Sequence, residues 1–144
     1  MAIITDTDLN NAYGATNVDE WADLNGDADA THIAARRTWA IDGATADFYS
    51  KMRKGRYIIP IADEANSPAD IKELVAGFAG LKLYFSRGNV STEAADNTNA
   101  KNLFSRKEKE LNTKLNDILA GKITVDLPVR TDYTHNAPYI YKEA

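Results

Sequence analysis

Residues 55–87 read GRYIIPIADEANSPADIKELVAGFAGLKLYFSR and contain the most regular pattern in the chain. Beyond Pro68, apolar residues recur at steps of three and four, which is the spacing of one face of an α-helix. Ser67 can cap this helix, Pro68 suits its first position, and Asp70 places a negative charge in its first turn. We therefore predict a helix up to Arg87 with one buried face at the centre of the core. That face consists of Ile71, Leu74, Val75, Phe78, Leu81, Tyr84 and Phe85.

Two glycines, Gly77 and Gly80, lie inside this predicted helix. Each costs about 1 kcal/mol of helix stability relative to alanine. We interpret them as positions at which a neighbouring helix packs close to the backbone.

Two short helices and one long helix are expected before this stretch. Thr5 or Asp6 can cap a first helix that ends at Gly14. Asn17 can cap a second one. The segment from about residue 28 to residue 54 lacks proline and carries two stripes of mainly apolar residues, which predicts a long helix buried on two sides. The first stripe holds Ile33, Arg37, Ile41, Ala44, Phe48 and Met52, and the second holds Ala35, Trp39, Ala46 and Tyr49.

The C-terminal part of the chain changes character twice. Residues 89–100 are small and polar, which indicates an exposed loop or a loosely held helical start. A helical pattern resumes at Leu103 and ends at Gly121. From Ile123 onward, two prolines and many β-favouring residues predict an extended tail. The expected protein is an all-α bundle of four to five helices, with a domain over residues 1–125 and an extended C-terminal arm over residues 126–144.

Composition limits the classes of function. A chain of 144 residues is about the size of one domain. Its net charge of −4 argues against a protein that mainly grips nucleic acid through a basic face. The absence of cysteine excludes disulfides and thiol chemistry. We expect neither a signal peptide nor a membrane span, because no segment approaches about 18 consecutive apolar residues.

No familiar catalytic motif is present, so we expect a protein that is not an enzyme, with no catalytic residues, no metal site and no cofactor. His32 and His135 are expected to be surface residues. Residues 23–29, DLNGDAD, alternate oxygen ligands as a calcium loop does, but the glycine is misplaced and Ala34 stands where the bidentate glutamate belongs. The alternative is that Asp27 or Asp29 caps the long helix.

A basic cluster, Lys51, Arg53, Lys54 and Arg56, follows the predicted long helix. These residues can stabilise the C-terminal end of the helix dipole, with Gly55 placed to end the helix. They can also contact phosphates or an acidic protein surface. A nucleic-acid-binding or regulatory helical domain that uses residues 51–56 is therefore an alternative function.

The C-terminal arm carries large side chains that a solvated tail does not need. We expect these anchors to dock on another chain, for instance by adding a strand to its sheet. A frayed terminus, or one that folds back on its own domain, is the alternative. The anchors are Tyr133, Tyr139, Ile140 and Tyr141.

The order of these pieces resembles that in small helical neck proteins of tailed bacteriophages, the head-completion or head–tail connector (adaptor) proteins, and in particular their Mu-like prophage branch. Two departures are the sequence immediately before Gly55, which lacks the Ile-Asp-x-Tyr-Leu register of the family, and a longer segment at residues 89–100. The C-terminal arm lies outside the resemblance. The matching pieces are Thr5–Leu9, Asp23–Asp29, Gly55–Ile61 with the pattern Gly-Arg-Tyr-x-x-Pro-Ile, Leu81–Arg87 and Ile118–Gly121.

The resemblance implies a virion structural protein, made in the cytoplasm of the bacterial host, that joins the portal vertex of the head to the downstream neck or tail protein. It implies a ring of copies, typically twelve, through which DNA passes without sequence-specific binding. It does not imply a membrane as a partner. The expected partners are thus the portal protein, neighbouring copies and the downstream neck protein. The arm anchors and the basic cluster are the expected contact residues for these partners.

Overall fold

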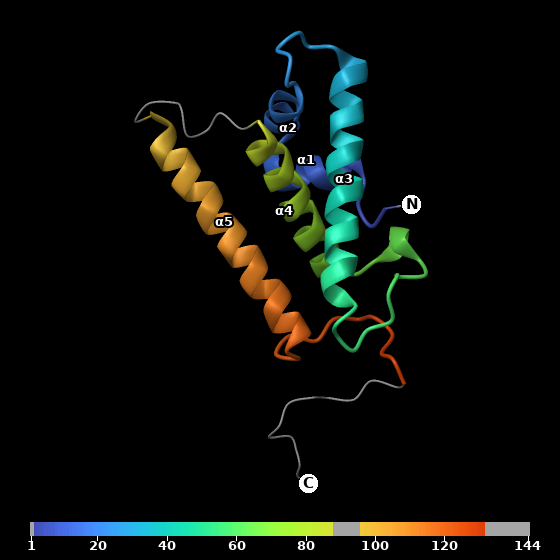
Figure 1. The fold of residues 1–144 in the computed structure, drawn as a ribbon. Coiled ribbons are helices and arrows are strands. Elements are labelled where there is room, and N and C mark those ends of the chain that lie inside the picture. Colours follow the sequence, from blue (N-terminus) through green and yellow to red (C-terminus); the bar gives the residue numbers. More distant parts are fainter. Residues whose placement is uncertain (1, 88–95, 132–144) are drawn as a thin grey trace.

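The structure of the protein is a computed structural model that describes residues 2–87 and 96–131, with the backbone alone for residues 96–102. Within these residues it forms five α-helices, a short 3-10 helix and one isolated β-bridge, which confirms the predicted all-α bundle (Figure 1). The last helix begins inside the segment that was predicted as a loop or a loosely held helical start. The elements are α1 (Asp6–Tyr13), α2 (Ala15–Ala22), α3 (Ala30–Met52), η1 (Glu64–Asn66), α4 (Ala69–Ser86) and α5 (Asp96–Leu119).

Helix α4 is the central element of the bundle. It contacts α1, α2, α3 and α5, and Figure 1 shows it between α3 and α5. Ile71, Leu74 and Val75 are fully buried, as predicted, but Ala79 and Leu83 on other sides of the helix are also fully buried. The prediction of one buried face was therefore too narrow, because four neighbouring helices cover α4 on most of its circumference.

The start of α4 differs from the prediction. Pro68 precedes the helix, and Ser67 does not cap it. The Ser67 hydroxyl instead donates a hydrogen bond to the carbonyl oxygen of Glu64, at 2.7 Å, and so closes η1. Asp70 does lie in the first turn, where its carboxylate accepts a hydrogen bond from the backbone N–H of Ile71 at 3.0 Å.

Both glycines of α4 permit close packing, as predicted. A Cβ atom on Gly77 would lie 2.8 Å from Leu111 of α5, and one on Gly80 would lie 2.1 Å from the ring of Tyr13 at the end of α1. The Tyr13 hydroxyl donates a hydrogen bond to the carbonyl oxygen of Gly77 at 2.7 Å. Burial raises the pKa of Tyr13 well above its ordinary value. The two glycines thus allow α1 and α5 to approach α4 from two directions.

The two N-terminal helices are joined by a single glycine. Thr5 caps α1 in a capping box with Asp8, and Gly14, at φ 90°, ends this helix as predicted. Helix α2 begins immediately afterwards, so Asn17 lies inside it and does not cap it. The Asn17 side chain instead donates to the carbonyl oxygen of Tyr13 at 2.9 Å.

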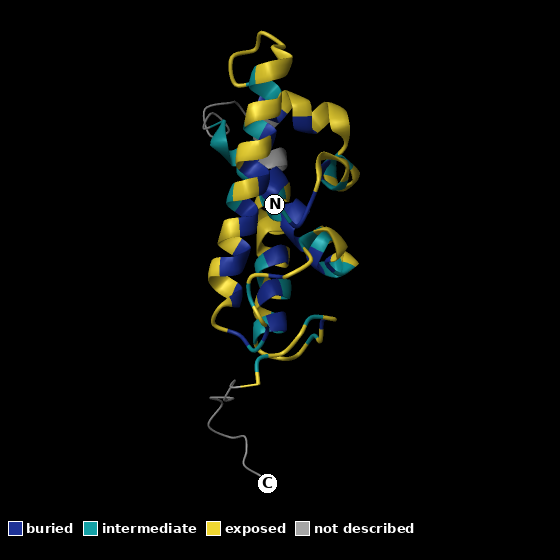
Figure 2. Cartoon of the chain, turned by 90° about the vertical axis from the view of Figure 1, so that its right-hand side faces the viewer, coloured by how far each residue is buried: buried dark blue, intermediate teal, exposed yellow. Residues whose placement is uncertain are grey.

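Helix α3 runs without interruption through Gly43, and Asp29 caps its start by accepting a hydrogen bond from Thr31 N–H at 3.0 Å. The first predicted stripe is buried or half-buried. The second is not, because Ala35, Trp39 and Ala46 are exposed and only Tyr49 is buried. The prediction that α3 is buried on two sides was therefore wrong, because the described residues of this chain cover only one side of the helix. Figure 2, which views the molecule from the α3 side, shows exposed residues along this outer face.

The buried charged residue of α3, Arg37, ties this helix to the two helices before it. Its side chain is 9% exposed and lies 2.7 Å from the carboxylate of Asp19 and 3.4 Å from that of Asp6. It also donates to the carbonyl oxygen of Ala15 at 3.5 Å. Since both carboxylates are more than half exposed, solvent weakens the attraction between the charges, and Arg37 acts through its buried stem and its part-buried hydrogen bonds to Asp19, Asp6 and Ala15.

The Arg37→Met variant is expected to lose about 1–2 kcal/mol of unfolding free energy, because methionine keeps the apolar stem but none of the hydrogen bonds. Urea denaturation followed by circular dichroism measures this. Arg36→Met is the matched control, since Arg36 is only half-buried and bonds to Ser86, and its expected effect is within about 0.5 kcal/mol. Equal midpoints for both variants would contradict the role given to Arg37.

Helix α5 packs on α4 through one narrow stripe. Leu111, Leu115 and Ile118 of α5 are buried, and Phe104 stacks on Tyr84 with ring centroids 3.9 Å apart. Phe104 also meets the ring of Trp21 edge-on at 5.4 Å. This aromatic contact connects α5 to α2 as well as to α4.

Candidate partner-binding end of the bundle

The Gly-Arg-Tyr-x-x-Pro-Ile element forms the turn between α3 and α4. Gly55 was predicted to end α3, but this prediction was wrong, because α3 ends at Met52, three residues earlier. Gly55 is buried, and a Cβ atom there would lie 3.0 Å from the side chain of Leu119 at the end of α5. Tyr57 then turns inward and is 1% exposed. Its aromatic side chain fills the end of the core between the α3–α4 turn and the segment after α5.

Tyr57 and its neighbours hold the segment that follows α5. The Tyr57 hydroxyl accepts a hydrogen bond from the N–H of Val125 at 3.2 Å. Tyr57 and Val129 form an isolated antiparallel β-bridge. Ile58 N–H donates to the carbonyl oxygen of Pro128 at 2.9 Å, and Arg130 N–H donates to that of Arg56 at 2.7 Å. We call this set of contacts the Tyr57 clamp.

The clamp fixes where the C-terminal arm leaves the body. Of the predicted arm, residues 126–131 are described, and residues 128–130 are bonded to the α3–α4 turn. The arm anchors lie beyond Thr131 and outside the described residues, so the structure does not place them. These are Tyr133, Tyr139, Ile140 and Tyr141.

The structure divides the predicted basic cluster. Arg53 and Lys54 are exposed at the end of α3, and the guanidinium of Arg56 lies 5.4 Å from the centre of the Tyr57 ring. Lys51 instead faces α4 and α5, where its Nζ lies 5.6 Å from the ring centre of Phe78 and bonds to Asn112 at 3.4 Å. Lys51 is thus separated from the other three basic residues.

Two basic residues that sequence reasoning missed join Arg53, Lys54 and Arg56. The clamp brings Arg130 to the turn, and its guanidinium donates to the carbonyl oxygen of Gly55 at 3.5 Å. Lys122 directly follows Gly121, and a Cβ atom added to Gly121 would lie 4.0 Å from the Arg56 guanidinium. No local sequence pattern links these residues, because more than sixty positions separate them from the turn. The basic end is hereafter the set Arg53, Lys54, Arg56, Lys122 and Arg130.

Exposed apolar residues lie beside these charges. Ile58 is 47% exposed and Val129 is 50% exposed, and the clamp places them in adjacent segments. Apolar residues framed by cations form a surface suited to an acidic protein partner, because burial supplies affinity and charge supplies orientation.

The carboxylates of residues 23–29 are engaged in turn formation. Asp23 accepts hydrogen bonds from the N–H groups of Gly26 and Ala28, both at 3.0 Å, and Asp27 accepts one from Asp29 N–H at 3.1 Å. Across residues 2–87 and 96–131, no cluster of three or more histidine, aspartate or glutamate side chains is arranged to hold a metal ion. The capping interpretation of Asp29 accounts for this loop.

Comparison of the chain with protein families, curated proteins and solved structures found no match. Among the described helices, none is both long enough and apolar enough to cross a bilayer. Sequence pattern and geometry therefore carry the functional inference.

Proposed function

We propose that the protein is a structural adaptor in the neck of a tailed bacteriophage, where copies form a ring that joins the portal vertex to the downstream neck or tail protein and lets DNA pass. The observation that carries this proposal is the Tyr57 clamp. The element most specific to the resemblance, Gly-Arg-Tyr-x-x-Pro-Ile, is the element that anchors the C-terminal arm to the body. Holding the arm at a defined place on the body is a role suited to a connector protein.

The chemistry of the clamp supports contact with a protein partner. The arm begins among the cations and exposed apolar residues of the basic end, and four large anchors follow within residues 133–141. Tyrosine is frequent among the residues that dominate binding energy, because its ring buries a large area at low entropic cost. The body supplies position and charge, and the arm supplies anchors.

The charge distribution supports passage of DNA without binding. All seven charged side chains among the first 29 residues are acidic. A ring that turns this region towards its channel repels phosphates and leaves the DNA mobile. In this proposal the protein needs no cofactor and no catalytic group.

Deleting residues 132–144 is expected to leave the body folded and to weaken binding to portal assemblies by about 100-fold or more, because it removes all four anchors. The deletion starts after Thr131 so that the clamp remains complete. Circular dichroism tests the fold, and co-sedimentation with purified portal particles tests binding.

A full-length Tyr139→Ala/Tyr141→Ala variant is the matched control for arm length. Because it keeps Tyr133 and Ile140, it is expected to bind more weakly than wild type but less weakly than the truncated chain. Retention of wild-type affinity by the truncated chain would rule out the arm as the portal-binding part.

A second candidate function is nucleic-acid binding, which is favoured by the addition of Lys122 and Arg130 to the cations of residues 53–56. A gel shift that weakens steeply with salt and is lost in an Arg53→Glu/Lys54→Glu variant would support it. Lys109→Glu, which reverses a charge on the exposed side of α5, is the control. Absence of a shift at low salt excludes this candidate.

A further inference from the structure

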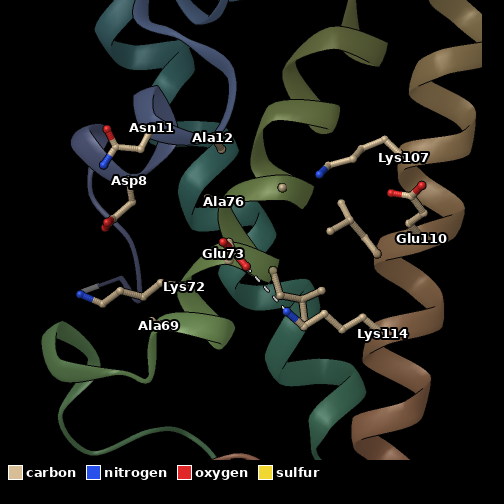
Figure 3. Close-up of a pocket in the computed structure, with 13 residues that line it drawn as sticks. Asp8, Asn11, Ala12, Ala69, Lys72, Glu73, Ala76, Lys107, Glu110 and Lys114 are labelled. Atoms are coloured by element: carbon tan, nitrogen blue, oxygen red, sulfur yellow. Dashed lines mark ion pairs between the residues drawn. The ribbon is translucent and has the colours of Figure 1, made fainter. Parts of the chain in front are cut away.

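A groove runs between α1 and α5, with α4 as its floor. It consists of two cavities, of about 510 and 750 Å³, which are continuous because Asn11, Ala12, Lys107 and Glu110 line both. Figure 3 shows the first cavity, with Asp8, Asn11 and Ala12 on one wall and Lys107 and Glu110 on the other. We call the two cavities together the α1–α5 groove.

The groove offers apolar surface along its length. The first cavity is lined by Leu74 and Ala76 of α4 and by Leu111 of α5. The aromatic side chains of Trp21 and Phe104 line part of the second cavity. A tyrosine or isoleucine side chain that entered the groove would therefore bury apolar area against apolar area.

The groove also carries more cations than carboxylates. Lys114 pairs with Glu73 at 3.8 Å, whereas Lys72 and Lys107 have no carboxylate within ion-pair distance among the described residues. The groove therefore favours an occupant that combines apolar anchors with an excess of negative charge. Its charged residues are the cations Lys72, Arg106, Lys107 and Lys114 and the carboxylates Asp8, Glu73 and Glu110.

The cavity on the other side of α5, between α3 and α5, has no such excess. It measures about 330 Å³, and its cations are already engaged, because Lys82 pairs with Asp47 at 3.6 Å and Lys51 bonds to Asn112 at 3.4 Å. With Glu108, its lining holds two cations and two carboxylates. Of the two sides of α5, the α1 side is thus the one suited to an acidic occupant.

The C-terminal arm has the chemistry that the groove favours. Residues 132–144 carry two carboxylates, Asp132 and Glu143, against one lysine, Lys142. The four arm anchors lie between these two carboxylates in the sequence. The arm therefore presents large side chains together with a net negative charge.

The arm also starts close enough to reach the groove of its own chain. The Tyr57 clamp holds residue 130 beside Gly55, against which Leu119 at the end of α5 packs. The groove begins at Lys114, five residues before Leu119 and thus about 7.5 Å along α5. The last three anchors follow Thr131 by eight to ten residues, which span up to about 26–33 Å when extended.

We infer that, before the protein meets a partner, the C-terminal arm folds back along α5 of its own chain and places Tyr139, Ile140 and Tyr141 in the α1–α5 groove. Modest affinity is sufficient, because tethering gives the arm an effective concentration of about a millimolar at the groove. A partner that binds the anchors must first displace them. Occupation of the groove requires only this chain, whereas displacement by the portal rests on the proposed function.

Engineered cysteines test the position of the arm, because the chain has no cysteine of its own. Ala144→Cys, which keeps every anchor and every charge of the arm, is combined with either Glu110→Cys or Glu108→Cys. Both glutamates are exposed, and they lie two residues apart on α5. Glu110 lines the groove and Glu108 lines the cavity on the α3 side, so the pair is matched in charge and in distance along α5.

Under mild oxidation at low protein concentration, Glu110→Cys/Ala144→Cys is expected to form a disulfide within one chain about tenfold faster, or more, than Glu108→Cys/Ala144→Cys. Non-reducing electrophoresis and mass spectrometry follow the reaction, and the product keeps the monomer mass of about 15.8 kDa. Adding Tyr139→Ala/Tyr141→Ala should remove the difference in rate, because it removes two of the three side chains that hold the arm in the groove.

Charge reversal tests the electrostatic part of the inference. Lys107→Glu is expected to slow the Glu110→Cys/Ala144→Cys reaction several-fold. Lys109→Glu, a matched reversal on α5 at an exposed residue that lines neither cavity of the groove, should leave the rate unchanged. Equal effects of the two reversals would contradict recognition of the arm by the groove.

Two results would overturn the inference. One is a disulfide that forms at Glu108→Cys as fast as at Glu110→Cys, since the arm would then have no preferred side of α5. The other is a disulfide that joins two chains, since it would assign the groove to the arm of a neighbouring copy.

Co-sedimentation with portal particles separates this inference from the proposed function. The oxidised Glu110→Cys/Ala144→Cys chain is expected to lose portal binding, and reduction should restore it. If portal binding needs residues 132–144 but the preferred disulfide does not form, the inference fails and the proposed function stands. If the preferred disulfide forms but portal binding does not need the arm, the inference stands and the proposed role of the arm fails.

Discussion

The Tyr57→Ala variant is expected to lose about 3–5 kcal/mol of unfolding free energy, the usual cost of truncating a fully buried large aromatic side chain. Tyr57 is 1% exposed, and its hydroxyl is the partner of the Val125 N–H. Alanine leaves a cavity at the end of the core and an unsatisfied N–H beside it. The loss is measured by urea denaturation, with circular dichroism and tryptophan fluorescence as independent probes.

Tyr57→Phe separates packing from hydrogen bonding at the same position. It keeps the ring and removes only the hydroxyl, so that the expected loss is about 1–2 kcal/mol. Limited proteolysis then reports on the clamp, because cleavage within residues 125–131 should accelerate in both variants before the helices are cut. A stable Tyr57→Ala variant with an unchanged cleavage pattern would show that the segment after α5 does not depend on Tyr57.

The Gly80→Ala variant is expected to lose about 2–3 kcal/mol of unfolding free energy, although alanine is the better helix former by about 1 kcal/mol. The added methyl group would lie 2.1 Å from the Tyr13 ring, which is anchored by its hydrogen bond to Gly77 and by edge contact with Trp21. The ring must therefore leave its site, and the end of α1 moves with it. Thermal and urea denaturation measure the loss.

Gly43→Ala is the control for helix propensity alone. A Cβ atom there meets the flexible end of Lys82 at 2.6 Å, which can move aside, so stability is expected to stay constant or to rise by up to about 1 kcal/mol. In a Tyr13→Ala background, Gly80→Ala should no longer destabilise. An equal loss in both backgrounds would exclude the Tyr13 ring as the cause.

Much of the helical framework could be predicted from local pattern. Apolar spacing located α3, α4 and the C-terminal half of α5, and Thr5 and Gly14 marked the ends of α1, because these signals act within a few residues. The two wrong predictions of helix caps, Ser67 and Asn17, have causes in the neighbouring residues. Pro68 takes the cap position of α4, so Ser67 lies one residue too early to cap it and donates to Glu64 instead. Asn17 does not cap α2 because Gly14 allows that helix to begin at Ala15.

Burial on more than one side was harder to predict, because it depends on which helices meet. The pattern of α4 gave one face, whereas small residues such as Ala79 allowed neighbours on the remaining sides. In α3 the opposite error occurred. Ala35, Trp39 and Ala46 have an apolar pattern but face outward, because α2 and α4, the helices that mainly contact α3, do not cover this side of it.

The candidate site was predicted in part. The basic residues 53–56 and the arm were identified from composition, but Lys122 and Arg130 were not, because their approach to the turn depends on contacts across 68 to 75 positions in the chain. The arm anchors, Tyr133, Tyr139, Ile140 and Tyr141, remain a prediction. The portal, ring and DNA contacts likewise remain proposals.

The Tyr57 clamp also has a consequence for valency. Each arm leaves the body at the same point, directly after the residues that the clamp holds, and its anchors follow within residues 133–141. In the ring that we propose, the first arm to bind raises the effective concentration of every other arm at its own site, because every arm starts from an equivalent position in the ring. Many arms that each bind weakly then hold the ring tightly to the portal. Any single arm can still dissociate and rebind while the others remain bound.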